Sequence, residues 1–317
     1  MTRSLASDTY RGQWAWKKIE LENAWARIAA AMPGQTVRDK PIIVAIADCG
    51  IKADHEAFVE NRLFVSCDRV IAPREGNCGD DDGHGTMLAG TIAGVTNPLY
   101  GDRGMFRPVR LLSVKFIDWR TPPMSRNAAE AIRHAVDHGA RIINASWEVG
   151  LKSRQLEEAI RYAADNGVLV IVAAGNNGGN NDDYRTFPAG FDVPSLISVM
   201  ASDRQDEKPY FSNYGRDTVD IAAPGVGIVS TYPYLYRLPE VARSYDPAYR
   251  NYSGTSPAAA HVSGAAALLL SINPDWTPEE IRTCLMESAD RVAGLRAFCP
   301  EGRRVNVGHA VAMALPS

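Results

Sequence analysis

The chain has 317 residues, of which 45% are hydrophobic and 22% are charged, and its formal net charge is -3. This balance is ordinary for a soluble globular protein and gives no reason to expect nucleic acid or an anionic membrane as a partner. No apolar run reaches the length that we expect of a membrane span, and the first residues lack the apolar centre of a secretory signal. The chain as given therefore predicts a cytoplasmic protein, or a secreted one if it is the mature part of a longer precursor.

Two groups of residues have the side chains of a metal or redox site but not the spacing of one. Five cysteines are an odd number, although Cys67 with Cys78 and Cys284 with Cys299 would each close a short loop. Their spacing matches neither a zinc ribbon nor a CxxC pair. The stretch EAIRHAVDH places one glutamate and two histidines on one helix face, but it lacks the HExxH order of zinc proteases. We interpret that face, which holds Glu130, His134 and His138, as solvated.

Apolar patterns predict helices and strands that alternate along the chain. Residues 14–30 show helical spacing, and residues 42–47 form a short branched run typical of a strand buried on both faces. Further strands are predicted within 107–118, 141–147, 168–179, 195–203 and 219–225, and helices within 87–95, 125–140, 154–167, 257–270 and 273–289. Alternation at this spacing implies right-handed crossovers and a parallel sheet.

The predicted fold class is α/β, with a three-layer, doubly wound and mostly parallel sheet that has helices on both faces. Nothing in the composition resembles a linker between domains. We therefore expect a single domain over residues 1–317, with residues 1–35 as a helical extension packed on it.

Two polar residues stand at the ends of predicted elements. Asp48 directly follows a buried strand, at the edge where ligands collect in open α/β sheets, although a carboxylate that caps the next turn is the alternative. His84 lies between two glycines and before an apolar helix. That setting suits a titrating group better than a core histidine, with a structural histidine as the alternative.

A third candidate is the serine in the stretch NYSGTSPAAAHVSGAAALLL. Pro257 fits the first position of a helix that starts immediately after Ser256. The hydroxyl would then lie beside free backbone N–H groups and the positive end of the helix dipole, where developing negative charge is stabilised. Simple helix capping is the alternative role. We expect His261, inside the helix, to be a satisfied core histidine.

Asp48, His84 and Ser256 together supply an acid, a base and a hydroxyl. Serine is a poor nucleophile at neutral pH, so a histidine must remove its proton and a carboxylate must orient that histidine. The surrounding stretches, VAIADCGI, DGHGTMLAG, VAAGNNG and YSGTSPAAAHVSG, resemble the subtilisin-like serine protease family, the subtilases. The order acid, base, nucleophile is also that of subtilisin. This resemblance, which runs from about residue 13 to residue 313, implies a subtilisin-like fold and a serine endopeptidase that works through an acyl-enzyme.

The same resemblance assigns further site residues. Asn176 corresponds to the side-chain donor of the oxyanion hole, with the backbone N–H of Ser256 as the other donor. The walls of the primary specificity pocket correspond to Ser146, Trp147, Glu148, Ala173, Ala174 and Gly175. A peptide or protein substrate would lie there in an extended conformation. Glu148 stands where many members have glycine, so it would favour basic substrate residues unless it turns to solvent.

Departures from the family pattern concern metals and small residues. Ala57 stands nine residues after Asp48, where calcium-binding members carry an aspartate, so we expect the usual strong calcium site to be absent. Asp182 and Asp183 remain candidates for weak calcium binding, and we expect no other cofactor. Cys49, and Ala260 in place of the usual proline, are variations that we expect the fold to tolerate.

Two alternatives to a general endopeptidase remain open. A specialised processing protease or a peptide macrocyclase would use the same acyl-enzyme with a narrow choice of substrate. A catalytically inactive binding module is the other alternative. It is disfavoured because all four expected catalytic positions are intact.

Overall fold

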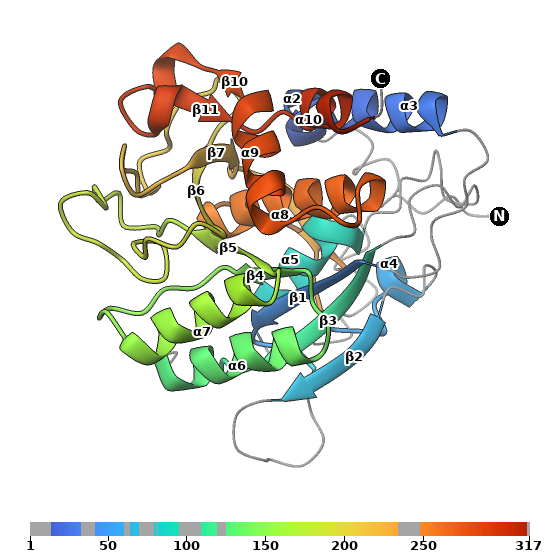
Figure 1. Ribbon diagram of the computed structural model, residues 1–317, viewed down its shortest axis with the longest axis vertical. Helices are drawn as coiled ribbons and strands as arrows, with labels where there is room; N and C mark the ends of the chain where they lie inside the picture. Colours follow the sequence, from blue (N-terminus) through green and yellow to red (C-terminus); the bar gives the residue numbers. More distant parts are fainter. Residues whose placement is uncertain are drawn as a thin grey trace, which may run out of the picture.

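The computed structural model describes residues 14–32, 42–59, 64–69, 79–80, 82–94, 109–118, 125–233 and 248–315. Its main sheet has the strand order β10-β11-β7-β6-β5-β4-β1-β3-β2 (Figure 1). All neighbouring pairs in this sheet are parallel except β10 and β11. The strands are β1 (Ile42–Asp48), β2 (Phe64–Arg69), β3 (Val109–Lys115), β4 (Ile142–Ala145), β5 (Leu169–Ala173), β6 (Leu196–Ser202), β7 (Ile221–Pro224), β10 (Asp290–Arg291) and β11 (Arg303–Arg304).

Helices cover both faces of this sheet (Figure 1). They are α2 (Trp14–Lys18), α3 (Leu21–Ala31), α4 (Glu56–Val59), α5 (His84–Ala89), α6 (Ser125–Asp137), α7 (Arg154–Asp165), α8 (Thr255–Ile272), α9 (Pro278–Ser288) and α10 (Val307–Ala314). Along β1, Val44 and Ile46 pack in the cluster that contains α8, whereas Ala45 and Ala47 pack in the cluster that contains α6 and α7. The predicted three-layer α/β architecture is confirmed.

The central helix α8 begins earlier than the sequence pattern indicates. Gly254 is its N-cap and Thr255 its first residue, so Ser256 lies inside the first turn and does not cap the helix. Pro257 is tolerated there because the first N–H groups of a helix have no partner within the helix. The expectation that the helix starts after Ser256 is therefore wrong.

Helix α8 also contradicts the expectation that no apolar segment is long enough to span a membrane. By length and composition it would be able to cross a membrane, but 89% of it is buried inside the protein.

His261 on this helix is buried, and its Nδ1 contacts the carbonyl oxygen of Pro224 at 3.0 Å. Its Nε2 has no hydrogen-bond partner among the described residues, so this core histidine is only half satisfied. Burial lowers the pKa of His261 to about 4, which keeps the ring neutral.

A two-stranded hairpin, β8 (Ile228–Thr231) paired with β9 (Tyr249–Tyr252), leads into α8. Sequence patterns missed it because β9 has two polar residues at its centre. The N-terminal helices support this hairpin, since Trp16 and Trp25 meet edge to face at 5.8 Å and pack with Val229 and Tyr249.

Cys284 and Cys299 are both free and buried, so the second candidate disulfide is not formed. The reason is that they pack in different clusters: the Cys284 thiol lies on the carbonyl of Ala310, and that of Cys299 on the carbonyl of Arg303. Cys78, in the other candidate pair, lies outside the described residues.

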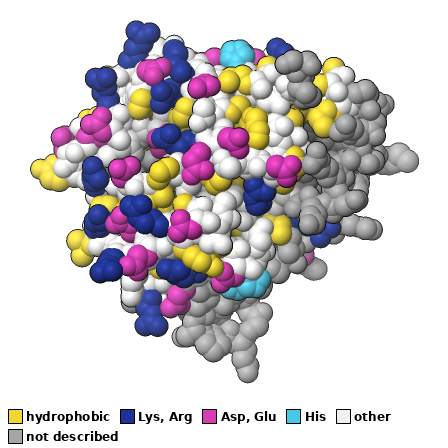
Figure 2. Space-filling model, in the orientation of Figure 1, with side chains coloured by type: hydrophobic (Ala, Val, Ile, Leu, Met, Phe, Trp, Pro, Cys, Tyr) yellow, Lys and Arg dark blue, Asp and Glu magenta, His cyan; other side chains and the backbone are white. Residues whose placement is uncertain are grey.

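The surface over α6 and α7 is polar. Figure 2 shows acidic and basic side chains interspersed on this side of the molecule, and several of them pair one helical turn apart, as Arg126 does with Glu130. His134, in the last turn of α6, and His138, which directly follows this helix, stack at 3.9 Å between ring centroids, and His138 Nδ1 contacts the carbonyl oxygen of His134. The contacts fit a helix surface better than a metal site.

Candidate active site

Asp48 is the last residue of β1 and has only 1% of its surface exposed. The backbone N–H of Cys49 donates to its Oδ1 at 2.8 Å. The Nδ1 atom of His84 lies 2.9 Å from Oδ1 and 3.0 Å from Oδ2 of the same carboxylate. The structure thus brings the predicted acid and base into direct contact at the carboxyl end of a central strand.

Two glycines allow this contact. Gly83 has φ 107°, a conformation that side chains rarely adopt, and it turns the chain into α5 so that His84 is the first helical residue. Gly85 faces the end of β1, where a Cβ atom would lie 2.1 Å from the carbonyl oxygen of Gly50. Any larger residue at Gly85 would push α5, and with it the His84 ring, away from Asp48.

Negative charge surrounds His84. Burial alone lowers the pKa of this histidine, but the nearby carboxylates of Asp48, Asp82 and Asp80 outweigh it and raise the pKa to about 8. The side chain keeps 31% of its surface exposed, so it remains accessible from solvent. Such a ring is protonated at neutral pH and becomes a free base as the pH rises through about 8.

Ser256 is held where α8 meets the end of β4. Its hydroxyl donates to the carbonyl of Ser146 at 3.3 Å, and the Ser146 hydroxyl donates to the carbonyl of Ser256 at 3.4 Å. Asn144 connects this pair to α8, because its amide donates to the Ser146 hydroxyl and accepts from Ser263. These contacts fix the backbone of Ser256 relative to the sheet.

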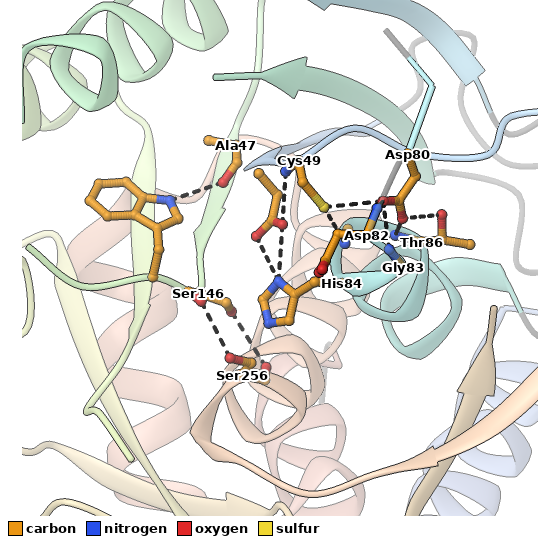
Figure 3. A network of polar contacts seen from close by, with 12 residues as sticks. Ala47, Cys49, Asp80, Asp82, Gly83, His84, Thr86, Ser146 and Ser256 are labelled. Carbon is orange, nitrogen blue, oxygen red and sulfur yellow. Dashed lines mark hydrogen bonds and ion pairs between the residues drawn. The ribbon is translucent and has the colours of Figure 1, made fainter. Parts of the chain in front are cut away.

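The His84 ring and Ser256 point toward each other in Figure 3. These two described residues are not hydrogen-bonded to each other, because the Ser256 hydroxyl donates to the carbonyl of Ser146 instead. A nucleophile and its base often tighten their contact only when substrate binds. The arrangement therefore brings acid, base and hydroxyl together, with the base between the other two.

Asn176 lies beside the first turn of α8. Its Oδ1 accepts from the backbone N–H of Thr255 at 2.8 Å and from the Thr255 hydroxyl at 3.2 Å. A backbone N–H only donates, so the amide oxygen must face Thr255 and the Nδ2 group must face away from it. The side chain is exposed, and its N–H groups are therefore available to an incoming oxygen.

The six residues predicted to form the specificity pocket separate into two groups. Trp147 turns its indole into the core, where Nε1 donates to the carbonyl of Ala47 at 2.9 Å, so only its backbone is available to line a pocket. Ala173 and Ala174 are also buried, as is Ser146. Glu148 is exposed, and its Oε2 lies 2.9 Å from where a Cβ of Gly175 would be. Glu148 and Gly175 are thus adjacent.

The acids considered for calcium have other contacts. Asp182 accepts hydrogen bonds from the backbone of residues 216–218 and from the Thr218 hydroxyl, and Asp183 accepts from the Asn180 amide. Within the described ranges, no three histidine, cysteine or acidic side chains gather as a metal ion would require. Weak calcium binding stays a prediction.

Sequence reasoning missed two residues of this region. Thr255 orients Asn176, and its only sequence signal is its place directly before Ser256. Asp80 binds the turn before His84, and it is the first of three consecutive aspartates that gave no reason to single out one of them.

Comparison with known proteins agrees with the geometry. A model of the subtilase family matches residues 39–304. The chain is 34% identical to thermitase from Thermoactinomyces vulgaris, covering 94% of this chain and 95% of that protein. It is 33% identical to Subtilisin Savinase from Lederbergia lenta, covering 80% and 86%. A solved protease structure from Pseudoalteromonas arctica PAMC 21717 has a TM-score of 0.76 at 26% identity, covering 95% of this chain and 97% of that one.

The extent of the family match, together with relatives that cover almost the whole chain, establishes the class of protein and the class of reaction. The chain belongs to the subtilase family and is a subtilisin-like serine endopeptidase.

Proposed function

We propose that Ser256, His84 and Asp48 carry out the peptide hydrolysis, with Asn176 as an oxyanion donor. The observation that carries this assignment is the contact of His84 Nδ1 with both oxygens of Asp48, in a ring that points toward Ser256. A carboxylate at Nδ1 holds the proton on that nitrogen, so the Nε2 lone pair of the neutral ring is directed at the hydroxyl.

The reaction then follows from the positions of these groups. As the Ser256 oxygen attacks the peptide carbonyl carbon, His84 Nε2 takes its proton, and Asp48 stabilises the imidazolium that forms. The negative charge on the former carbonyl oxygen is met by the Asn176 Nδ2 group and the backbone N–H of Ser256. His84 next protonates the leaving amine, and an acyl-enzyme remains on Ser256. Water, activated by the same histidine, hydrolyses the ester and restores the serine.

The peptide substrate is proposed to lie extended beside Ser146 and Gly175, with its reacting residue near Glu148. Glu148 is exposed, so a basic substrate side chain would pair with it in a solvated setting. Such pairs are worth about 0.2 to 1 kcal/mol, which is a preference and not an absolute specificity. A narrow processing protease or a macrocyclase would share all of these groups and would differ in cleavage profile and products.

Replacing Ser256 with alanine is expected to remove nearly all hydrolysis, because the hydroxyl that would attack the peptide carbonyl is lost. The loss in kcat is expected to be roughly a millionfold, a magnitude established within this family. Peptide hydrolysis and labelling by a fluorophosphonate probe measure it, with thermal unfolding as the control for folding. Wild type that neither hydrolyses peptides nor takes the probe would instead support an inactive binding module.

Replacing Asn176 with alanine is expected to lower kcat by about 100 to 1000-fold with little change in KM, because the lost donor acts on charge that exists only in the transition state. This magnitude is also established within this family. The matched control is Asn177→Ala, since the Asn177 side chain is also an exposed loop amide but accepts from the backbone N–H of Gly179. Equal activity of the two variants would remove Asn176 from the mechanism.

Activity is expected to depend on the ionisation of His84. Its pKa is raised to about 8, and only the neutral ring accepts the proton of Ser256. The value of kcat/KM should therefore increase with pH up to about 8 and level off above it, which a pH profile on a neutral peptide substrate measures. A profile already level at pH 7 would contradict the raised pKa.

Changing Glu148 to glutamine is expected to reduce the preference for lysine or arginine before the cleaved bond by about 1.4 to 5-fold in kcat/KM, the weight of one exposed ion pair. Glutamine keeps the size and removes the charge, so cleavage of peptides with an uncharged residue at that position serves as the control. Mass spectrometry of a peptide library measures the preference and also reveals cyclised products. An unchanged preference would mean that Glu148 does not pair with the substrate side chain.

A further inference from the structure

Asp80 is a buried carboxylate that the reaction itself does not use. It has 7% of its surface exposed and accepts five hydrogen bonds (Figure 3). The donors are the Cys49 thiol and the N–H groups of Asp82 and Gly83 to Oδ1, and the N–H and hydroxyl of Thr86 to Oδ2. Four of the five come from residues 82–86, the turn and first helical residues around His84. Both oxygens of Asp80 therefore fix the main chain that carries the histidine.

The remaining donor to Asp80, the thiol of Cys49, connects this turn to Asp48, the proposed catalytic acid. Cys49 follows Asp48, and its thiol donates to Asp80 at 3.2 Å while accepting from the N–H of Gly85 at 3.3 Å. Burial, together with Asp48 and Asp80, raises the pKa of the Cys49 thiol well above its ordinary value. The thiol stays protonated and is able to donate. One side chain thus bridges the end of β1 and the start of α5.

Packing leaves little freedom around this bridge. Gly85 sits directly against the carbonyl of Gly50, so the first turn of α5 already touches the loop after Asp48. On the other side, the buried Lys115 of β3 donates to the carbonyl of Gly79, the residue before Asp80. The position of His84 over Asp48 therefore depends on contacts that neither residue makes itself.

We propose that Asp80 and Cys49 are positioning residues that hold His84 in line with Asp48 and Ser256 for proton transfer. Neither contacts the reacting atoms in the mechanism proposed above, on which this inference depends. Their effect should appear in kcat and not in KM, because substrate contacts are unchanged. A misplacement of about 1 Å at a catalytic group can cost about 100-fold in rate.

Charge supplies a second readout. The carboxylates that act on His84 are Asp48, Asp82 and Asp80. The other charged or titratable groups of this region are Cys49, which binds Asp80, and Lys115, which binds Gly79. Tyr252 interacts with Asp80 and Asp82 and also with Tyr232 and Arg250. Removing the charge of Asp80 removes one of the carboxylates that raise the pKa of His84. The rise of kcat/KM should then occur at lower pH than in the wild type.

The test uses Asp80→Asn and Cys49→Val, with Cys49→Ser as the conservative control. Fluorophosphonate titration counts active sites, so that kcat is expressed per correctly folded molecule. We expect Asp80→Asn to lose about 10 to 100-fold in kcat at constant KM, with its pH profile shifted to lower pH. Cys49→Val should lose about fivefold, the weight of one hydrogen bond, and Cys49→Ser should stay near wild type because its hydroxyl also donates and accepts.

Other outcomes would overturn the proposal. Asp80→Asn and Cys49→Val variants that only unfold at lower temperature, with wild-type kcat per titrated site, would show that both residues are merely structural. If Asp80→Asn does not fold, the comparison of kcat between Cys49→Val and Cys49→Ser is the test, and equal values would overturn the proposal. Failure of the proposed function is distinguishable, because the wild type itself would then show no hydrolysis and no titratable site.

Discussion

The contact between His84 and Asp48 depends on how closely α5 approaches the end of β1. That approach is possible because Gly85 has no side chain to meet the carbonyl of Gly50, and because Gly83 adopts a positive φ. Hydrogen bonds to Asp80 from the N–H groups of Gly83 and Thr86 hold the same turn and the start of the helix. His84, the proposed catalytic base, is thus positioned by backbone geometry, and its side chain needs only to reach a carboxylate already in place.

Ser256, the proposed nucleophile, is positioned by a second set of contacts, around the first turn of α8. The long buried helix is anchored in the core between the sheet and α10, so its amino end cannot shift without disturbing that packing. Ser146 and Ser256 exchange hydrogen bonds there, and Thr255 orients Asn176. The start of one helix therefore presents both the oxygen that would attack the substrate and the N–H groups that would receive the developing charge in the proposed mechanism.

The carboxylates around His84 affect the protonation of both His84 and Cys49. Three carboxylates lie close enough to His84 to raise its pKa although burial opposes it. In the proposed mechanism, these carboxylates would stabilise the imidazolium that forms on His84. The same raised pKa keeps the resting ring protonated at neutral pH. Burial, together with two of these carboxylates, Asp48 and Asp80, keeps the Cys49 thiol protonated, so the bridge between β1 and α5 is preserved over the pH range in which the histidine titrates.

The sequence by itself determined the alternation of strands and helices, and the candidacy of Asp48, His84 and Ser256, because apolar periodicity and flanking glycines are local signals. Only the tertiary structure decided where α8 begins, that the Trp147 indole lies in the core, and that Cys284 and Cys299 lie apart. The same is true of Asp80, whose role depends on Cys49, 31 residues away in the chain. Each of these outcomes follows from contacts between distant segments, which no local pattern encodes.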